Sequence, residues 1–304
     1  MDILKKIRSA GEHGTLFEVT IANIEDWINS NFLPSWALAS IEELVEKEAW
    51  KELNNRFYKY LEFGTGGMRG RTIGELITKA EKGIPMEFEA PQHPAVGAAT
   101  LNDFNIIRAT IGLFHYCGQY LHKKPVNNEA AKIVIAHDVR FFSKHFCDLI
   151  ASTWVRLGGC AEIFSGPRST PQLSFSVRYL SCTCGVVITA SHNPPHDNGV
   201  KIYFDDGAQI VSPHDIGIIK CVNEVKLSEI SPYLNKKMDG VMTLPLSVDQ
   251  AYLDGLEENI LAPELFKNNK LRIVFTPIHG TGGIISLPLM ERHGIEVISV
   301  RQQM

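Results

Sequence analysis

The first sixty residues carry apolar side chains at a spacing typical of helices. Beyond Ser40, these apolar positions are Leu44, Trp50, Leu53, Phe57, Tyr60 and Leu61. Because this recurrence gives each helix one apolar stripe, we predict helices between about Phe17 and Phe63. The stretch Ser40–Glu43 has the S-x-x-E form of a capping box, which marks a helix start. The stripe favours packing against the following domain over use as a partner surface.

After residue 100, the pattern alternates between helical and strand-like periods. Apolar residues predict an amphipathic helix at 106–121, and the apolar run 131–136 predicts a strand. Further helices are predicted at 146–157, from 170 onward, at 248–261 and at 284–293. Further strands are predicted at 160–164, 185–188, 271–275 and 295–300. This alternation is typical of an α/β protein, and we predict a mixed β-sheet sandwiched between helices.

A polar stretch divides the chain after Ser212 and Pro213. Residues 226–240 carry mixed charges and two turn-forming stretches, so we place a domain boundary near residue 225. The predicted units are a helical extension at 1–60, an α/β domain at 61–225 and a second, partial α/β domain at 226–304. The segment 75–93 has no clear periodicity, and we predict a loop there without assigning it a role.

Composition excludes several classes of function. The chain has 304 residues, of which 44% are hydrophobic, so it can bury a substantial core. Its 30 basic and 34 acidic residues give a net charge of -4, which provides no general attraction for nucleic acid or an anionic membrane. The six cysteines are scattered without a C-x-x-C pair. Because no secretory signal or membrane-spanning run is evident, we expect a cytoplasmic protein with reduced thiols.

One polar loop concentrates the chemically active side chains. From Thr189 to Lys201 it reads Thr-Ala-Ser-His-Asn-Pro-Pro-His-Asp-Asn-Gly-Val-Lys, directly after the predicted strand 185–188. The two prolines fix two φ angles and remove two N–H donors, which would hold Ser191 in one place. We predict a turn at 197–199 and a hairpin turn at 205–207.

This loop suits phosphoryl transfer better than acyl transfer. A serine hydrolase would present G-x-S-x-G, whereas Ala190 and His192 flank Ser191. Lys201 and His192 could instead place positive charge on a phosphate carried by Ser191 and move protons at the attacking alcohol. Taken alone, however, a Ser-His-Asn-Pro run is more often an N-cap or an Asx turn.

Two further segments carry candidate anion-binding groups. Residues 62–70 contain four glycines and Arg69, but they match neither a P-loop nor G-x-G-x-x-G. Their backbone could approach a ligand closely while Arg69 forks onto phosphate oxygens; alone, such a segment is more often a structural turn. Asp138 and Arg140 follow the predicted strand 131–136, at the edge where α/β sheets place their sites. A structural ion pair between these two residues is an equally sound interpretation.

Taken together, these motifs resemble those of the α-D-phosphohexomutases, the family of phosphoglucomutases and phosphomannomutases. The run T-A-S-H-N-P-x-x-x-N-G-x-K resembles the phosphoserine loop, and residues 64–70 resemble the G-T-[AS]-G-L-R-G segment. Residues 138–143 are similar to the D-x-R-x-x-S loop. Residues 203–210 resemble the branch containing larger phosphoglucomutases and phosphopentomutases. The H-G-x-G-G run at 279–283 is similar to the start of the second domain, and a contact of His279 with substrate stays open.

The resemblance implies a mutase that interconverts sugar 1-phosphates and 6-phosphates through a phosphoserine and a sugar 1,6-bisphosphate, which also serves as activator. It implies Mg²⁺ as cofactor, with phosphorylated Ser191 as one ligand. The implied catalytic residues are Ser191, His192, Lys201 and Arg69. The implied substrate- or phosphate-binding residues are Thr65, Gly66, Arg69, Asn193 and, in a supporting role, Arg140. A phosphopentomutase or a non-catalytic, mutase-like binding module are the alternatives.

Some family loops have no counterpart in the 304 residues. The sequence contains neither the D-x-D-x-D-R metal loop nor the G-E-x-S-G sugar-recognition loop that the resemblance implies. Hard oxygen ligands of the metal-loop kind are what a divalent ion needs. We therefore expect an N-terminal fragment of a longer enzyme, one that binds sugar phosphate or phosphate at most and is inactive alone. The sequence does not indicate an oligomeric state.

Overall fold

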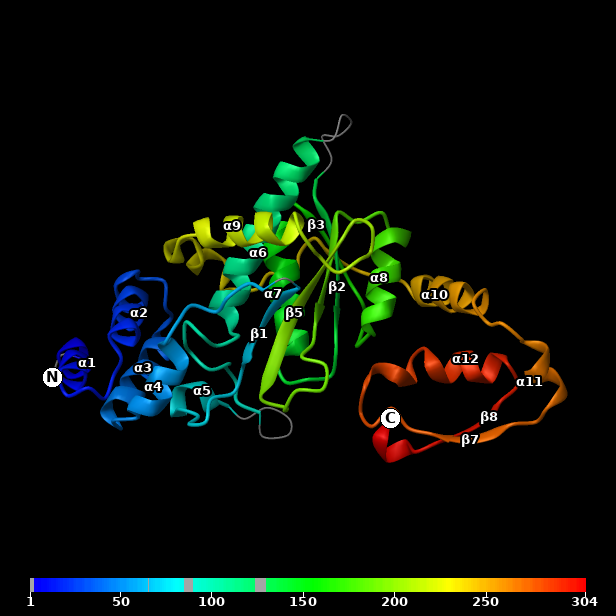
Figure 1. Cartoon of the computed structure of the whole chain (residues 1–304), viewed down its shortest axis with the longest axis horizontal. Coiled ribbons are helices and arrows are strands. Elements are labelled where there is room, and N and C mark those ends of the chain that lie inside the picture. Colours follow the sequence, from blue (N-terminus) through cyan, green and yellow to red (C-terminus); the bar gives the residue numbers. More distant parts are fainter. Residues whose placement is uncertain (1–2, 65, 85–89, 124–129) are drawn as a thin grey trace.

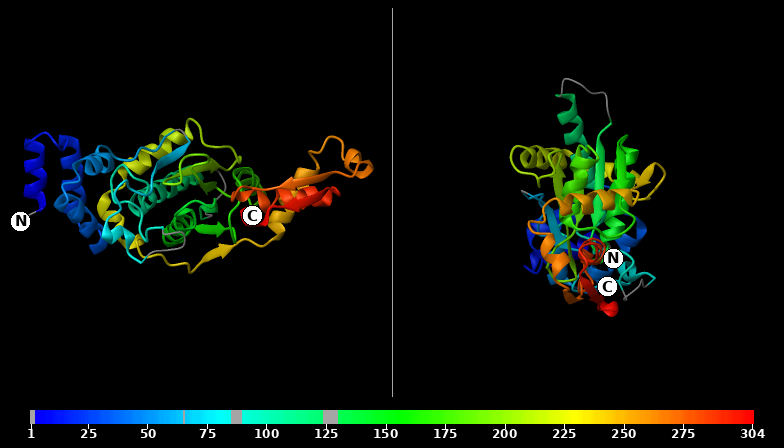
Figure 2. Two further views of the ribbon diagram at one scale, coloured as in Figure 1. Left: turned by 90° about the horizontal axis from the view of Figure 1, so that it is seen from below. Right: turned by 90° about the vertical axis from the view of Figure 1, so that its right-hand side faces the viewer.

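The computed structural model describes residues 3–64, 66–84, 90–123 and 130–304. Three parts follow one another along the long axis of the molecule (Figure 1). The N-terminal helices come first, a six-stranded sheet with helices on both faces is central, and a small unit with two strands ends the chain. The left-hand view of Figure 2 shows the same order of parts. Within the described ranges, no helix is long and apolar enough to cross a membrane.

The N-terminal helices share a hydrophobic core with the central part. They are α1 (Ile3–Glu12), α2 (Glu18–Asn29), α3 (Ser35–Glu46) and α4 (Trp50–Phe57). The buried ring of Trp27 makes edge contacts with Phe57 and Phe104, with centroids 5.5 and 5.4 Å apart. Because Phe104 belongs to the central part, one core is continuous across both parts. The predicted packing of these helices against the following domain is confirmed.

The helix start predicted at Ser40 is wrong. Helix α3 begins at Ser35, and Ser40 lies buried in its middle. Its hydroxyl donates to the Glu81 carboxylate, 2.9 Å away, so the S-x-x-E pattern reflects a tertiary contact. A capping box is present at Thr78 instead, where Thr78 and Glu81 exchange hydrogen bonds at the start of α5 (Lys79–Lys82).

The central sheet is mixed, as predicted. Its strands, in spatial order, are β1 (Gly67–Arg71), β5 (Asp197–Phe204), β4 (Cys184–Ile188), β2 (Lys132–His137), β3 (Cys160–Ile163) and β6 (Val241–Thr243). The pairs from β4 to β6 are parallel, whereas β5 runs antiparallel to both β1 and β4. Parallel neighbours bring their carboxyl ends to one edge, so the loops after β2 and β4 lie close together.

Helices cover both faces of this sheet because its central strands are apolar on both sides. Along β2, Ile133 and Ile135 join the larger core, whereas Val134 and Ala136 join a smaller core on the opposite face. On the larger side lie α6 (Asp103–His122), α7 (Ser143–Arg156) and α9 (His214–Glu224). On the smaller side lies α8 (Thr170–Tyr179), with α10 (Ser247–Glu257) packed next to it. The predicted sandwich is confirmed.

The sheet continues beyond the domain boundary predicted at residue 225. Strand β6 pairs in parallel with β3, and Asp249 of α10 forms a two-pronged ion pair with the buried Arg168, with N–O distances of 2.8 and 2.7 Å. The polarity of residues 226–240 suggested a linker because this segment crosses the surface before β6 adds its few residues to the sheet edge. The C-terminal unit contains α11 (Glu264–Asn268), β7 (Arg272–Phe275), α12 (Ser286–Arg292) and β8 (Glu296–Ser299), with β7 and β8 parallel.

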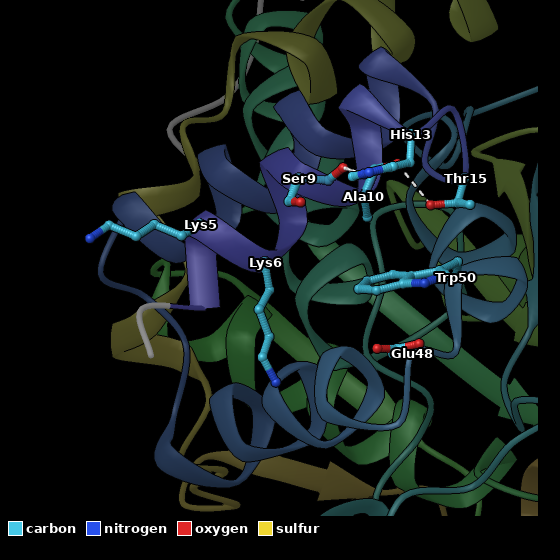
Figure 3. Close-up of a pocket in the computed structure, with 8 residues that line it drawn as sticks. All are labelled: Lys5, Lys6, Ser9, Ala10, His13, Thr15, Glu48 and Trp50. Carbon is cyan, nitrogen blue, oxygen red and sulfur yellow. Dashed lines mark hydrogen bonds between the residues drawn. The ribbon is translucent and has the colours of Figure 1, made fainter.

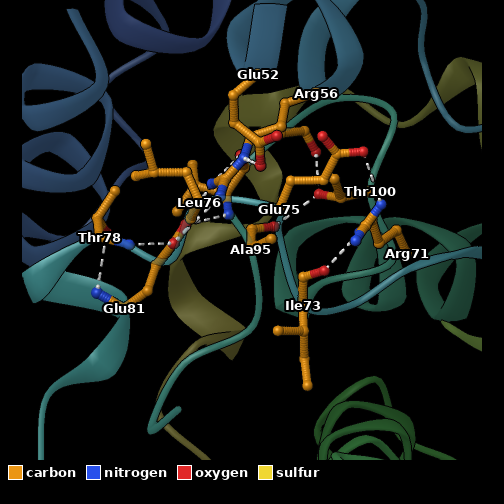
Figure 4. Close-up of polar contacts among 12 residues, drawn as sticks. Glu52, Arg56, Arg71, Ile73, Glu75, Leu76, Thr78, Glu81, Ala95 and Thr100 are labelled. Carbon is orange, nitrogen blue, oxygen red and sulfur yellow. Dashed lines mark hydrogen bonds and ion pairs between the residues drawn. The ribbon is translucent and has the colours of Figure 1, made fainter. Parts of the chain in front are cut away.

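A buried charge cluster gives part of segment 75–93 a role (Figure 4). The Arg56 guanidinium, 1% exposed, donates to Glu52 at 2.7 Å and to Glu81 at 2.5 Å. Glu81 also accepts from the backbone N–H of Val96 at 3.0 Å. Burial raises the pKa of the Glu81 carboxyl, but the Arg56 charge and these hydrogen bonds outweigh it and hold the pKa below its usual value. The segment thereby anchors α3 and α4.

We predict that Glu81→Ala destabilises the fold strongly. The substitution leaves Arg56 buried with one carboxylate fewer, and breaking one partner of a buried ion pair costs about 3 to 5 kcal/mol. Urea unfolding should show that loss in the free energy of unfolding. The control, Glu25→Ala, removes an exposed pair with Arg8 and should cost less than about 1 kcal/mol. Equally small losses from both variants would contradict the anchoring role.

Candidate active site

The loop that carries Ser191 connects two neighbouring antiparallel strands, β4 and β5. We call residues 189–197 the serine loop. The turn predicted at 197–199 is wrong, because β5 already begins at Asp197. The chain reverses earlier, where the N–H of Asn193 donates to Ala190 at 3.1 Å and that of Asp197 donates to Pro194 at 3.0 Å. The hairpin turn predicted at 205–207 is confirmed by the hydrogen bond from Gly207 N–H to Phe204 O at 2.8 Å.

Ser191 adopts a left-handed backbone conformation, with φ at 58°. For a residue with a Cβ atom, this conformation costs about 1–2 kcal/mol, so neighbouring groups must hold it. The Ser191 N–H donates to the Thr189 hydroxyl at 2.9 Å, and its carbonyl accepts from Arg140 at 2.7 Å. Both polar backbone groups of Ser191 are therefore held by side chains. The residue itself is exposed, so its hydroxyl is accessible to a ligand.

Arg140 lies on the neighbouring loop, residues 138–143, which we call the arginine loop. Its guanidinium, with the side chain 13% exposed, donates to four carbonyl oxygens of the serine loop. They belong to Asn193, Ser191, Pro194 and Asp197, at 2.5, 2.7, 2.9 and 3.1 Å. Its Nε lies 3.5 Å from Asp138. The structural ion pair considered from sequence is thus present. Phosphate binding by Arg140 stays a prediction, to which we return below.

Asn198 and Gly199 join the two loops, and sequence reasoning had assigned them only to a turn. The fully buried Asn198 amide donates to the Ser143 hydroxyl at 2.8 Å and to the Phe141 carbonyl at 3.0 Å. At Gly199, a Cβ atom would lie 2.6 Å from the Thr189 carbonyl oxygen. Close packing therefore requires both Asn198 and Gly199. In the sequence, the only sign of this requirement was that the two residues belong to the family motif.

Arg69 and Lys201 project from the same face of the sheet. Arg69 pairs with Gly199, and Lys201 pairs with Gly67, across the antiparallel strands β1 and β5. Directly paired residues and every second residue share a face, so both cations lie on one side. Arg69 donates to the Asn193 side chain at 3.3 Å. The structure thus brings Arg69 to the serine loop from 124 residues away in the sequence.

The other predicted glycine-segment residues are placed differently. The carbonyl of Gly66 accepts hydrogen bonds from Ile202 N–H at 3.2 Å and from the Gln209 amide at 3.1 Å, which fixes it to β5 and the following hairpin. Thr65 lies outside the described residues. Gly66 therefore holds the start of β1 in place next to Lys201.

A cleft of about 920 Å³ opens in front of the serine loop. Ser191, His192 and Asn193 line one wall together with Asp138 and Arg140. The opposite wall comes from the C-terminal unit, namely Ile278, His279, Gly280 and Thr281. Arg69 and Lys201 are not among the lining residues. The position of His279, left open by the sequence, is therefore across the cleft from Ser191.

The electrostatics next to the cleft favour a neutral His137. This residue ends β2 and is 4% exposed. Burial lowers the pKa of its imidazole, so the neutral form is favoured. Its Nδ1 lies 2.8 Å from the carbonyl oxygen of Asp138, which fits a hydrogen bond donated by the ring. His137 thereby supports the arginine loop without adding charge beneath it.

A second cleft, of about 660 Å³, lies among the N-terminal helices (Figure 3). Lys5, Lys6 and Trp50 are among its lining residues, and none of the predicted site residues reaches it. Figure 3 shows the Lys5 side chain pointing away from the other lining residues. Among the described residues, no three histidine, cysteine or acidic side chains gather in a way that could hold a metal ion.

Comparisons with known proteins agree with this geometry. Residues 94–229 match the family model described as phosphoglucomutase/phosphomannomutase, alpha/beta/alpha domain I. The phosphopentomutase of Homo sapiens is 31% identical over 261 residues, which cover 82% of this chain and 38% of that protein. The phosphoglucomutase of Staphylococcus saprophyticus is 30% identical over 268 residues, covering 82% of this chain and 40% of that protein. The chain belongs to the phosphohexomutase family.

A solved structure supports the fold of this phosphohexomutase chain. It is described as a candidate phosphomannomutase from Thermus thermophilus, and it superposes with a TM-score of 0.59 at 23% identity. The match covers 80% of this chain and 46% of that one. The chain thus spans about two fifths of the length of the curated relatives it matches. The roles implied for Ser191, His192, Lys201 and Arg69 stay predictions.

We predict that Gly199→Ala disrupts the phosphohexomutase serine loop. The new methyl group would meet the backbone oxygens of Thr189 and Met68, at 2.6 and 3.0 Å, and neither can move without moving a strand. Thermal and urea unfolding should show a loss of about 1–3 kcal/mol. The control, Gly118→Ala in helix α6, meets no atom within 4 Å and should stabilise by about 0.5–1 kcal/mol. Equal effects at both positions would contradict the close packing at Gly199.

Proposed function

We propose that this chain carries the phosphoserine part of a sugar phosphate mutase. Ser191 would take a phosphoryl group and pass it to a free hydroxyl of a sugar phosphate. The observation that carries this proposal is the exposed Ser191 itself, held in a left-handed conformation by two side chains at the mouth of a large cleft. Such strain is retained where the surrounding structure enforces it, and it is concentrated at functional sites.

The proposed step transfers one phosphoryl group. The bond between phosphorus and Ser191 Oγ breaks while the sugar hydroxyl oxygen bonds to phosphorus, giving a sugar bisphosphate. The sugar hydroxyl gives up its proton to Lys201 or His192, and the Ser191 oxygen regains one. In the second half of the cycle, the bisphosphate turns over in the site and the bond between its other phosphorus and the sugar oxygen breaks as Ser191 Oγ bonds to that phosphorus. Arg69 would stabilise the charge on the transferring group, which is the main task in phosphoryl transfer.

The described residues fit Mg²⁺ poorly. Phosphorylated Ser191 would offer one oxygen ligand, but the nearby carboxylates are already engaged. Asp138 accepts from the Ser143 hydroxyl at 2.6 Å, and Asp197 accepts from the Asn193 amide at 3.1 Å. A divalent ion of this kind needs several oxygen ligands, so we derive no step through it. Mg²⁺ as cofactor rests on family membership alone.

The substrate is proposed as a hexose phosphate, as the motifs first indicated. A pentose 1-phosphate is the specific alternative, and it is favoured by the 31% identity to a phosphopentomutase. A non-catalytic, mutase-like module is the more distant alternative. It would have no need to keep an exposed serine in a strained conformation with Arg69 and Lys201 on the adjacent sheet face.

We predict that Ser191 becomes phosphorylated by a hexose 1,6-bisphosphate. Because the 304 residues alone are expected to bind phosphate at most, peptide mass spectrometry of the whole protein should place one phosphate on Ser191 and none on Ser191→Ala. The Ser228→Ala control removes an exposed hydroxyl far from the cleft in the sequence and should leave phosphate uptake unchanged. Loss of the phosphate from Ser191 on adding excess sugar monophosphate would show transfer to the sugar. Comparing the rate of this loss with glucose 6-phosphate and with ribose 5-phosphate would distinguish the two substrates. A folded whole protein without phosphate on Ser191 would favour the non-catalytic module.

We also predict that Lys201 moves the proton at the sugar hydroxyl, whose oxygen attacks during transfer to the sugar and leaves during phosphate uptake by Ser191. Lys201→Gln should slow phosphate uptake by about 10²–10⁴-fold, which is the usual contribution of a general acid or base. The matched variant His192→Gln should slow it far less. Quenched-flow sampling with mass spectrometry would measure both rates. The reverse order of the two effects would assign the proton transfer to His192.

A further inference from the structure

We propose that Arg140 is a positioning residue that holds the serine loop in its reactive shape, and that it does not bind the substrate phosphate. This inference deepens the proposed function and rests on it for its catalytic consequence. The structural part, that Arg140 determines the conformation of the loop, stands on hydrogen bonds alone.

Four of the five N–H donors of Arg140 donate hydrogen bonds within the protein. A guanidinium has five N–H donors. The two on Nη2 face the carbonyls of Ser191 and Asn193, and the two on Nη1 face those of Pro194 and Asp197. The fifth, on Nε, faces the Asp138 carboxylate at 3.5 Å. A phosphate bound by two N–H groups of this side chain would have to displace at least one loop carbonyl, because all four Nη donors are in use.

The serine loop needs an outside hydrogen-bond donor because its own backbone has few N–H donors. Pro194 and Pro195 lack N–H donors, so they cannot satisfy neighbouring carbonyls. Four carbonyl oxygens of the loop surround the Arg140 guanidinium, which donates a hydrogen bond to each of them. Hydrogen bonds from a charged donor are roughly twice as strong as those between neutral groups. Arg140 therefore donates to the carbonyls of Ser191, Asn193 and Asp197, and it adds a second donor to the Pro194 carbonyl, which also accepts from the Asp197 N–H at 3.0 Å.

The contact with Ser191 links this support to reactivity. The left-handed conformation of Ser191 is held at its N–H by Thr189 and at its carbonyl by Arg140. Without the second contact, Ser191 could relax to an ordinary backbone conformation, which would point its hydroxyl elsewhere. A displacement of about 1 Å at a reacting atom can cost about 10²-fold in rate.

Arg140 is itself fixed by the arginine loop. Asp138 accepts from the backbone N–H of Arg140 at 2.9 Å and from the Ser143 hydroxyl at 2.6 Å. Ser143 also accepts from the buried Asn198, which belongs to β5. The backbone of Arg140 is thus fixed through Asp138 to the first residue of α7 and, through Ser143 and Asn198, to the sheet.

The test compares Arg140→Lys with the control Arg8→Lys, which alters an exposed ion pair in the N-terminal helices. Lysine keeps the charge but cannot reach four carbonyls in a plane. Amide hydrogen exchange of residues 189–197 should accelerate by about tenfold or more in Arg140→Lys only. Phosphate uptake by Ser191 at saturating hexose 1,6-bisphosphate should slow by about tenfold or more, while the half-saturating concentration stays within about twofold.

The outcomes separate the two hypotheses. A higher half-saturating concentration with unchanged exchange in the serine loop would overturn the inference and make Arg140 a phosphate ligand. If the whole protein takes no phosphate on Ser191, the proposed function fails, but the exchange comparison still decides whether Arg140 holds the loop. Unchanged exchange in Arg140→Lys would then overturn the inference on its own.

A measurement on the unaltered protein covers the case in which Arg140→Lys does not fold. In arginine-labelled protein, NMR should show separate, slowly exchanging Nη protons for Arg140, with contacts to Pro194 and Asn193. These signals should not shift when inorganic phosphate is added. Averaged, rapidly exchanging Nη protons, or a shift with phosphate, would overturn the inference.

Discussion

The loop that presents Ser191 depends on hydrogen bonds that its own backbone cannot make. Two adjacent prolines remove N–H donors, and a left-handed residue lies at the position where the hydroxyl must be exposed. Side chains from outside the chain reversal, above all Arg140, supply the missing partners. The buried Asn198 and His137 in turn contact the arginine loop, at Phe141, Ser143 and Asp138.

The mixed sheet makes this arrangement possible. Parallel β2 and β4 bring the arginine loop beside the serine loop, whereas antiparallel β5 and β1 return the chain so that Lys201 and Arg69 share one face. The N-terminal helices are joined to this framework by the buried Arg56 and Glu81. Removal of either residue would leave the other charge buried without its partner, which is costly. The pair therefore makes the helical extension part of the same folded structure as the central part.

Sequence reasoning succeeded where a local signal matched the final environment. The apolar run at 131–136 became β2, the run at 185–188 became most of β4, and Thr170 opens helix α8. The prediction from sequence failed where a polar residue forms a hydrogen bond with a partner far away in the chain. Ser40 looked like a cap because its bond to Glu81 could not be foreseen, and Asn198 looked like a turn residue because its buried contact with Ser143 comes from another loop.

The amino-acid sequence alone was enough for the α/β class, the mixed sheet between helices and the family, and it supplied the prediction that Ser191 is the reactive serine. Those features follow from periodicity and from short motifs, which are local properties of the chain. The spatial roles of Arg140, Asn198 and Glu81, the extension of the sheet to β6, and the place of His279 across the cleft became visible only in three dimensions. Each of these features depends on contacts between residues far apart in the chain. Neither the spacing of residues nor the composition predicts such contacts.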